Sequence, residues 1–344
     1  MACRMKTKIR LLNEASVEEA AGILRAGGLV AFPTETVYGL GANALDEGAV
    51  RGIFLAKGRP QDNPLIVHLP KSELPAGLVS ALPDAAECLM EAFWPGPLTL
   101  VLPKGPKIPD AVSAGLPTVA LRAPAHEGAQ ALLRAAGLPI AAPSANASGR
   151  PSPTLARHVF DDLSGKIPLI LDGGACEIGI ESTVLDLSGA EPVLLRPGSV
   201  TLEELGAALG KTPRLGRGVM RPLPAGERAL SPGLLHRHYA PRAEVILVRG
   251  EGEALVQRLK DEYDAAENAL ILCADALLDR LQPRNCQGLG ADERRMAKTL
   301  FAALRQADER SFSKVILQGV AEEGLGLALM NRALRAAGFR AVGP

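Results

Sequence analysis

Two patterns of apolar residues alternate along the first 210 positions. Stretches with apolar residues every three or four positions predict amphipathic helices, and short continuous apolar runs predict buried strands. Helices are expected at residues 16–28, 46–58, 83–93, 126–137, 153–165 and 201–210. Strands are expected at residues 29–33, 64–69, 97–103, 118–124, 138–145, 168–174, 182–188 and 192–198. The alternation predicts an α/β domain with a twisted, mixed sheet.

Two of these helices carry start signals in the sequence. Ser16 with Glu19 three residues later has the pattern of a capping box, so the first helix is expected to begin there. Gly27 and Gly28 are expected to end that helix. Asp46 is the expected N-cap of the second.

The pattern changes after residue 210. Residues 211–242 are rich in Pro, Gly and Arg and show no periodicity, which predicts a linker or a functional loop. Three strands (244–250, 268–274 and 314–320) then alternate with three helices (252–263, 292–308 and 326–338). This order predicts a small Rossmann-like domain with a parallel sheet. The predicted organisation is therefore a domain at 1–210, a linker at 211–242 and a second domain at 243–344.

Composition narrows the class of protein. Hydrophobic residues make up 47% of the 344 positions and aromatic residues only 3%, so the core is expected to consist of Leu, Val, Ile and Ala. The charges of the 38 basic and 38 acidic residues cancel, so the formal net charge is zero. A protein devoted to non-specific nucleic-acid binding needs a basic face, and the balance argues against that class.

Several familiar signals are missing from the sequence. The five cysteines are odd in number and none has CxxC spacing, which argues against a disulfide framework or a zinc site. No signal peptide and no apolar run of membrane-spanning length is evident, so we expect a cytoplasmic protein without a membrane partner. No P-loop and no complete dinucleotide fingerprint is present.

Five strand-end segments carry polar clusters, and strand ends are where an open α/β sheet presents ligand-binding groups. They occur in FPTETVYGLG, KGRPQDNPLIVHL, TVALRAP, AAPSANASGRPSPT and the pair GIESTVLDL and VLLRPGS. Each cluster alone is explained by ordinary turn hydroxyls, helix-end cations or a core histidine. Together they indicate a site. Arg122 and Arg196 end apolar strands, and a buried arginine needs an anionic partner. These segments offer few acids, so anionic ligands are expected to supply the negative charge.

The motifs appear in one order that resembles a known family. FPTETVYGLG, KGRPxxNPLIVH, FWPGPLTLVL, LRAP, APSANxSGxPSPT, IESTVLDL, LLRPG and HYAP are those of the two-domain threonylcarbamoyl-AMP synthases. The resemblance covers almost the full length and is strongest at residues 31–198 and 231–241. It implies a YrdC-like N-terminal domain, a linker and a small α/β C-terminal domain.

The resemblance implies an enzyme that makes L-threonylcarbamoyl-adenylate and pyrophosphate from L-threonine, bicarbonate or CO2, and ATP. Mg²⁺ is expected on the triphosphate, and no metal site made by protein residues is expected. The product is expected to pass to the tRNA threonylcarbamoyl transferase complex, which modifies an adenosine beside the anticodon. A weak direct contact with tRNA is left open.

The resemblance also implies roles for individual residues. Lys57 and Arg59 are expected to supply positive charge for catalysis at the triphosphate. Arg122 is expected to grip the threonine carboxylate, and the remaining threonine contacts are assigned to Thr36, His68, Ala142 and Ser182. The ATP contacts are assigned to Arg59, Asn63, Thr118, Ser144, Asn146, Ser152, Arg196 and Tyr239.

The segment SPGLLHRHYAP at residues 231–241 is the patterned part of the linker and is expected to act as a lid over the reactive product. The alternative is that this segment only tethers the two domains. For the whole chain, a binding module for tRNA or double-stranded RNA is the alternative function, favoured by the arginines of the linker. A carbamoyl-phosphate-handling maturation enzyme is a third reading, but the chain lacks the accessory modules of those proteins.

Overall fold

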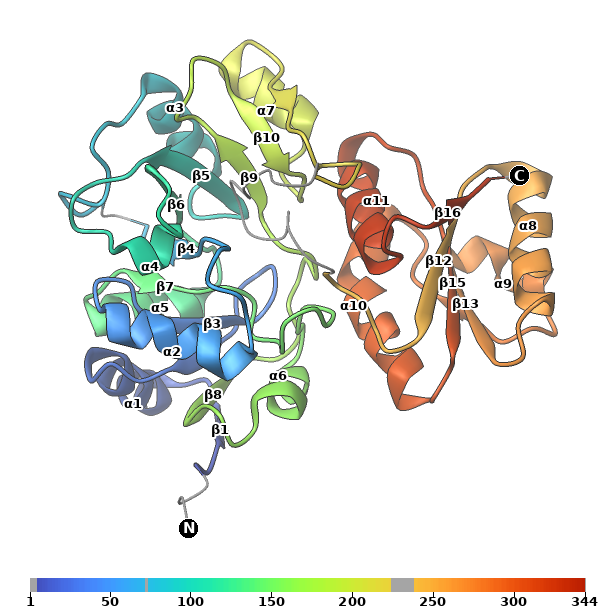
Figure 1. Ribbon diagram of the computed structural model, residues 1–344, viewed down its shortest axis with the longest axis horizontal. Helices are drawn as coiled ribbons and strands as arrows, with labels where there is room; N and C mark the ends of the chain where they lie inside the picture. The colour runs from blue at the N-terminus through green and yellow to red at the C-terminus, as the bar shows by residue number, and fades with distance from the viewer. Residues whose placement is uncertain (1–4, 72–73, 224–237, 344) are drawn as a thin grey trace.

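The strands in the described part of the chain form two separate sheets, which Figure 1 shows side by side with helices packed on both. The computed structural model describes residues 5–71, 74–223 and 238–343. The predicted α/β fold, with a mixed sheet followed by a parallel sheet, is confirmed.

The first sheet is mixed and has eleven strands in the described part of the chain, in the order β1-β8-β2-β3-β7-β4-β6-β5-β9-β10-β11. Its strands are β1 (Lys8–Leu11), β2 (Val30–Phe32), β3 (Gly39–Asn43), β4 (Ile66–His68), β5 (Leu98–Pro103), β6 (Thr118–Arg122), β7 (Ile140–Ala141), β8 (Leu169–Asp172), β9 (Thr183–Asp186), β10 (Val193–Arg196) and β11 (Arg214–Leu215). Its helices are α1 (Glu14–Arg25), α2 (Glu47–Lys57), α3 (Asp84–Phe93), α4 (Asp110–Ser113), α5 (Glu127–Ala136), α6 (Ala156–Leu163) and α7 (Leu202–Leu209).

Helices cover both faces of the first sheet. Along β8, Leu169 and Leu171 pack with α1 and α5, whereas Ile170 between them joins the core beneath α2, α3 and α6. Successive side chains of a strand point to opposite faces. Because both faces are covered, these strands consist of continuous apolar runs, which is the pattern that identified them in the sequence.

Within the described residues, the second sheet has five parallel strands in the order β14-β13-β15-β12-β16. Its elements are β12 (Glu244–Val248), α8 (Gly252–Asp264), β13 (Ala269–Cys273), a 3₁₀ turn at Asp275–Leu277, α9 (Leu278–Leu281), β14 (Cys286–Gly288), α10 (Glu293–Glu309), β15 (Lys314–Gln318), α11 (Gly324–Ala336) and β16 (Ala341–Val342). In Figure 1, α10 and α11 lie between this sheet and the first domain, whereas α8 and α9 lie on the far side.

The start of the first helix differs from the prediction. Helix α1 begins at Glu14 and its N-cap is Asn13, whose side chain accepts a hydrogen bond from the Ser16 backbone N–H at 3.0 Å. Ser16 is therefore the third residue of the helix, and its hydroxyl accepts from the Asn13 backbone N–H at 2.9 Å. The predicted Ser16–Glu19 capping box is wrong. Asp46 is the N-cap of α2, as predicted.

Several short strands were not predicted. β3 has the sequence GLGAN, without the β-branched or aromatic residues that mark a strand. Its Gly41 lies so close to its neighbours that an added Cβ would be 2.8 Å from Ile140 Cγ2 and 2.9 Å from a Phe32 ring carbon. Packing against β2 and β7 thus selects glycine here. β11 extends the first sheet into the segment predicted as a linker, and residues 231–237 of the predicted lid lie outside the described residues.

Candidate active site

A pocket opens where several strands of the first sheet end, which is the location predicted from the polar clusters. His68 is the last residue of β4, Arg122 the last of β6 and Arg196 the last of β10. β4 and β6 are parallel, and their register places His68 opposite Arg122. The pocket is lined by Thr34, Thr36, Val37, Gly39, Arg59, Ile66, His68, Arg122, Ala142, Pro143, Ser144, Glu181, Ser182, Arg196, His238 and Tyr239.

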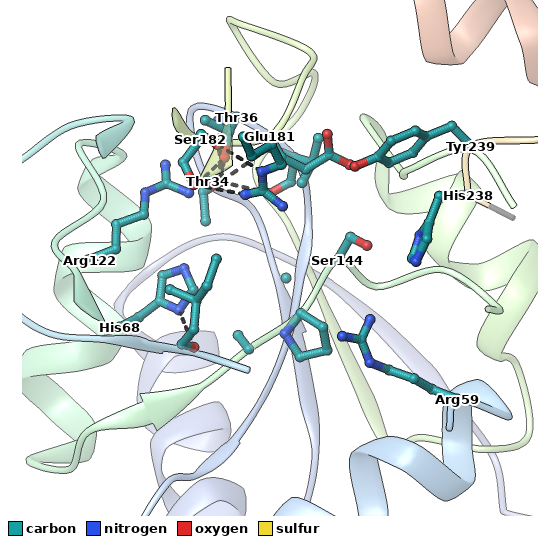
Figure 2. A pocket seen from close by; sticks show the side chains of 16 residues that line it. Thr34, Thr36, Arg59, His68, Arg122, Ser144, Glu181, Ser182, His238 and Tyr239 are labelled. Carbon is teal, nitrogen blue, oxygen red and sulfur yellow. Dashed lines mark hydrogen bonds between the residues drawn. The ribbon is translucent and has the colours of Figure 1, made fainter. Parts of the chain in front are cut away.

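Figure 2 shows that the pocket has two ends. Arg122 and His68 lie at one end, and Arg59, His238 and Tyr239 lie at the other, with Ser144 between them. Of the residues assigned to threonine, Thr36, His68, Arg122, Ala142 and Ser182 all line the pocket. Of those assigned to ATP, Arg59, Ser144, Arg196 and Tyr239 line it. The structure therefore brings most of the predicted residues together.

Arg122 is held from three sides. Its Nε donates to the Gly96 carbonyl at 3.1 Å, Nη1 donates to Thr36 Oγ1 at 3.0 Å, and Nη2 contacts Glu35 Oε1 at 2.6 Å. Both members of the ion pair are buried, with side-chain exposures of 4% and 7%. Burial acts to raise the pKa of Glu35, but the Arg122 charge and the hydrogen bonds that the carboxylate accepts, from the Ala125 backbone and from Arg122 among others, together outweigh burial, so the pKa is lowered. This geometry fixes the guanidinium plane at the end of the pocket.

This pairing corrects one step of the sequence argument. We expected few acids near Arg122 and Arg196, and therefore expected ligands to supply their counter-charge. Glu35 pairs directly with Arg122, and the electrostatic influence of Glu181 reaches Arg196. The premise was wrong, because the acids stand in the quoted motifs themselves, beside Thr36 and Ser182.

His68 is buried, with 4% of its surface exposed. Its Nδ1 lies 3.2 Å from the Ile66 carbonyl oxygen, and its ring packs edge-on against Phe32. Burial, and then the neighbouring Arg122 charge, lower the pKa of His68 to about 3. The imidazole is therefore neutral near pH 7, so it offers the pocket hydrogen-bonding atoms rather than a second cation.

Glu181, Ser182 and Arg196 form one wall of the pocket. Arg196 donates through Nε to the Ser182 carbonyl at 3.0 Å and through Nη2 to Ser182 Oγ at 3.1 Å. Ser182 Oγ also lies 2.8 Å from Thr99 Oγ1. Glu181 Oε1 accepts a hydrogen bond from Ser152 Oγ at 2.5 Å. Ser152 thus supports the wall from behind and lies outside the lining.

Lys57 is hydrogen-bonded to the loop that carries Ser144 and Asn146. Lys57 Nζ donates to the carbonyl oxygens of Ser144 and Asn146, both at 2.5 Å, and Ser144 Oγ donates to Asn146 Oδ1 at 2.5 Å. Lys57 and Asn146 are buried and lie outside the lining. Burial, and then the Arg59 charge, place the pKa of Lys57 well below its usual value. In this structure Lys57 holds the loop that presents Ser144.

Arg59 has a buried N–H donor that no described residue accepts from. Its Nη2 lies 3.3 Å from the carbonyl oxygens of Asn63 and Pro64, but its buried Nε has no hydrogen-bond partner in the described part of the chain. Asn63 Oδ1, which is also buried, lacks one as well. A buried polar atom without a partner is costly, and at a pocket wall it indicates a place for a ligand. Burial lowers the pKa of Arg59 to about 10, so it stays a cation at neutral pH.

His238 and Tyr239 bring the segment between the two domains into the pocket. Tyr239 has φ 62°, is 3% exposed, and stacks on Phe301 of α10 with ring centroids 5.1 Å apart. Burial raises the pKa of the phenol. One face of the ring therefore belongs to the second domain while the residue lines the site of the first.

Some predicted residues are not brought to the pocket, and some lining residues were not predicted. Lys57, Asn63, Thr118, Asn146 and Ser152 lie outside the lining. Thr118 begins β6, at the opposite end of the strand from Arg122. Among the residues missed, Glu181 is the informative one. Because a buried arginine needs an acid, Arg196 was the signal that could have led to the glutamate beside Ser182.

Two absences hold within the residues that the structure describes. No group of three or more His, Cys, Asp or Glu side chains there is arranged to hold a metal ion. Within the same residues, no helix combines the length and apolar character that crossing a bilayer requires.

Two family models and several known proteins match this chain. The family model described as "Telomere recombination" matches residues 22–198, and the model for the threonylcarbamoyl-AMP synthase C-terminal domain matches residues 200–338. The threonylcarbamoyl-AMP synthase of Pyrococcus abyssi is 46% identical, with 96% of each chain covered. That of Bacillus subtilis is 44% identical, with 96% of this chain and 95% of the relative covered.

A solved structure matches over the whole length. The crystal structure of P. abyssi Sua5 complexed with L-threonine superposes with a TM-score of 0.90 at 44% identity, covering 99% of both chains. The chain therefore belongs to the threonylcarbamoyl-AMP synthases, a family of nucleotidyl-transferring enzymes.

Proposed function

We propose that the pocket binds L-threonine and ATP side by side and converts them, with bicarbonate or CO2, into L-threonylcarbamoyl-AMP and pyrophosphate. The observation that carries the proposal is the two-ended pocket. The fixed guanidinium of Arg122 and the neutral imidazole of His68 lie at one end, and Arg59, whose Nε has no partner among the described residues, lies at the other. The similarity to a relative complexed with L-threonine supports the choice of amino acid.

Threonine is assigned to the Arg122 end. The guanidinium is already oriented by Gly96, Thr36 and Glu35, so little ordering is needed when a carboxylate approaches. Thr36, Ser182 and the Ala142 backbone offer hydrogen-bonding partners for the hydroxyl and the amine. His68 contributes without adding positive charge beside the threonine ammonium, because its pKa is lowered to about 3.

ATP is assigned to the Arg59 end. Arg59 and Arg196 supply positive charge, and the unpartnered Nε of Arg59 is available to an anionic oxygen. Ser144 and Tyr239 line the same region, whereas Lys57 fixes the Ser144 loop from behind. Direct ATP contacts of Asn63, Thr118, Asn146 and Ser152 stay predictions. Mg²⁺ enters this scheme with the triphosphate. Both carboxylate oxygens of Glu181 already have protein partners, so Glu181 is not offered as its ligand.

The chemistry follows from charge. The threonine amine adds to CO2 and releases a proton, or adds to the carbon of bicarbonate and releases water; either route gives a carbamate. A carbamate oxygen then attacks the α-phosphorus, the bond to the β-phosphate oxygen breaks, and pyrophosphate leaves. Two anions must meet, so the arginines lower the barrier by offsetting their repulsion. Positioning supplies the rest, and no protein nucleophile is required.

The product is an activated carbamoyl group, suited to transfer to the adenosine N6 of tRNA. We propose that a tRNA threonylcarbamoyl transferase complex receives it.

A reconstituted assay tests the proposal. Protein, Mg²⁺–ATP, L-threonine and bicarbonate are combined, and pyrophosphate is measured while each substrate is omitted in turn. We expect release only when threonine and bicarbonate are both present, with L-2-aminobutyrate as a matched control that lacks only the hydroxyl. Equal pyrophosphate release without threonine would refute the proposed reaction.

A further inference from the structure

The second domain reaches the wall of the pocket through buried arginines. Arg305 of α10 and Arg332 and Arg335 of α11 have exposures of 3%, 0% and 4%. Each donates to backbone carbonyls on the other side of the interface, to Pro151, Pro197 and Gly218 respectively, all at 2.6 Å. In Figure 1, α10 and α11 are the helices that face the first domain. The two domains are therefore joined by specific polar contacts.

Arg332 differs from the others because its acid lines the pocket. Its Nε donates to Glu181 Oε2 at 3.0 Å, and its Nη2 donates to the Glu181 carbonyl at 3.1 Å. Its Nη1 bonds Pro197, the residue after Arg196. The Arg332 guanidinium thus contacts two chain segments of the pocket wall: the one that carries Glu181 and Ser182, and the one that carries Arg196. Arg332 itself is absent from the lining.

Glu181 brings a negative charge to a site proposed to bind anions. Its side chain is 8% exposed. Burial acts to raise the pKa of Glu181, but the charges of Arg332 and then Arg196, together with hydrogen bonds from Ser152 and the Glu181 backbone, outweigh burial, so the pKa is lowered and the carboxylate stays ionised. Without Arg332 this charge would either repel a triphosphate or occupy Arg196, which the nucleotide end of the pocket needs.

We propose that Arg332 is a positioning residue of the active site, supplied by the C-terminal domain, that neutralises and fixes Glu181 so that the pocket accepts an anionic nucleotide. The inference rests on the ATP part of the proposed function. It assigns the second domain a direct part in substrate binding, because the first domain alone would carry Glu181 without the guanidinium that bonds its carboxylate.

The test separates an electrostatic effect on ATP binding from a general loss of folding stability. Dissociation constants for Mg²⁺–ATP and for uncharged adenosine are measured by calorimetry for the native chain, Arg332→Met, Arg332→Lys and Arg332→Met/Glu181→Gln. We expect Arg332→Met to weaken ATP binding by about tenfold or more and adenosine binding by less than about threefold. Arg332→Lys keeps the charge and is expected to recover much of the loss. The double variant leaves no uncompensated charge and is expected to return ATP affinity to within about threefold of native.

Arg305→Met is the matched control. It also removes a buried interdomain cation, whose acid, Asp162, lies 2.8 Å away and outside the pocket lining. We expect it to lower the temperature of unfolding without a selective loss of ATP affinity. Equal losses of ATP and adenosine in Arg332→Met, no recovery in the double variant, or the same ATP-selective loss in Arg305→Met would each overturn the inference. A native chain that bound no ATP would instead refute the proposed function.

Discussion

Replacing Arg122 by lysine separates its two roles at the threonine end of the pocket. Lysine keeps the positive charge that Glu35 needs at 2.6 Å, but a single ammonium cannot reproduce the fork that also bonds Thr36 and Gly96. One lost hydrogen bond to a charged group is worth roughly 1.5–3 kcal/mol. That energy corresponds to an increase of about 10- to 150-fold in the KM for threonine.

The assay is steady-state pyrophosphate release with threonine and ATP varied independently. We expect the KM for ATP to change by less than about threefold, because Arg59, at the other end of the pocket, is untouched. Arg122→Ala is the informative comparison. It leaves the buried Glu35 without its partner, so the free energy of unfolding is expected to fall by roughly 3–5 kcal/mol as well. A rise in the KM for ATP with an unchanged KM for threonine would show that the two ends of the pocket have been assigned in reverse.

Three further predictions concern single residues. His68 has a pKa of about 3 in the folded chain, below its unfolded value, so the unfolded state binds more protons. This stability contribution is complete above about pH 6.5 and is lost as pH falls towards 3. His68→Gln should remove that part of the pH dependence in urea titrations. Lys57→Met should lower the free energy of unfolding by about 1.5–3 kcal/mol and raise the KM for ATP, because the Ser144 loop loses its support; an unchanged KM would mean that the loop keeps its shape without the ammonium. Tyr239→Ala should lower synthesis and also stability, by roughly 3–5 kcal/mol, because the ring packs on Phe301. Tyr239→Phe should retain the stability, and unchanged synthesis in Tyr239→Ala would leave the segment as a tether only.

The location of the site was predictable because apolar runs ended in polar residues. His68, Arg122 and Arg196 each close a buried strand, and parallel or mixed sheets gather such ends at one edge. The division of the chain into two α/β sheets followed from the same apolar runs and from the change of pattern after residue 210. Residue roles came from the family motifs rather than from periodicity.

Features that depend on tertiary packing were not predictable. Arg122 and Glu35 are 87 positions apart, and no local pattern pairs them. Arg332 stands in an amphipathic helix, where an arginine is expected to face solvent, yet its exposure is 0% because α11 packs against the first domain. β3 was missed because glycine is selected there by close packing, which overrides strand propensity.

Isotope labelling tests the central claim most directly. The protein is incubated with Mg²⁺–ATP, ¹³C-bicarbonate and ¹⁵N-threonine, and the adenylate is analysed by NMR. The account predicts a product in which the labelled carbon is bonded to the threonine nitrogen, seen as a one-bond ¹³C–¹⁵N coupling, and linked through oxygen to the phosphorus of AMP. Consumption of ATP with all ¹³C remaining in bicarbonate and CO2, or an adenylate of threonine that contains no ¹³C, would contradict it.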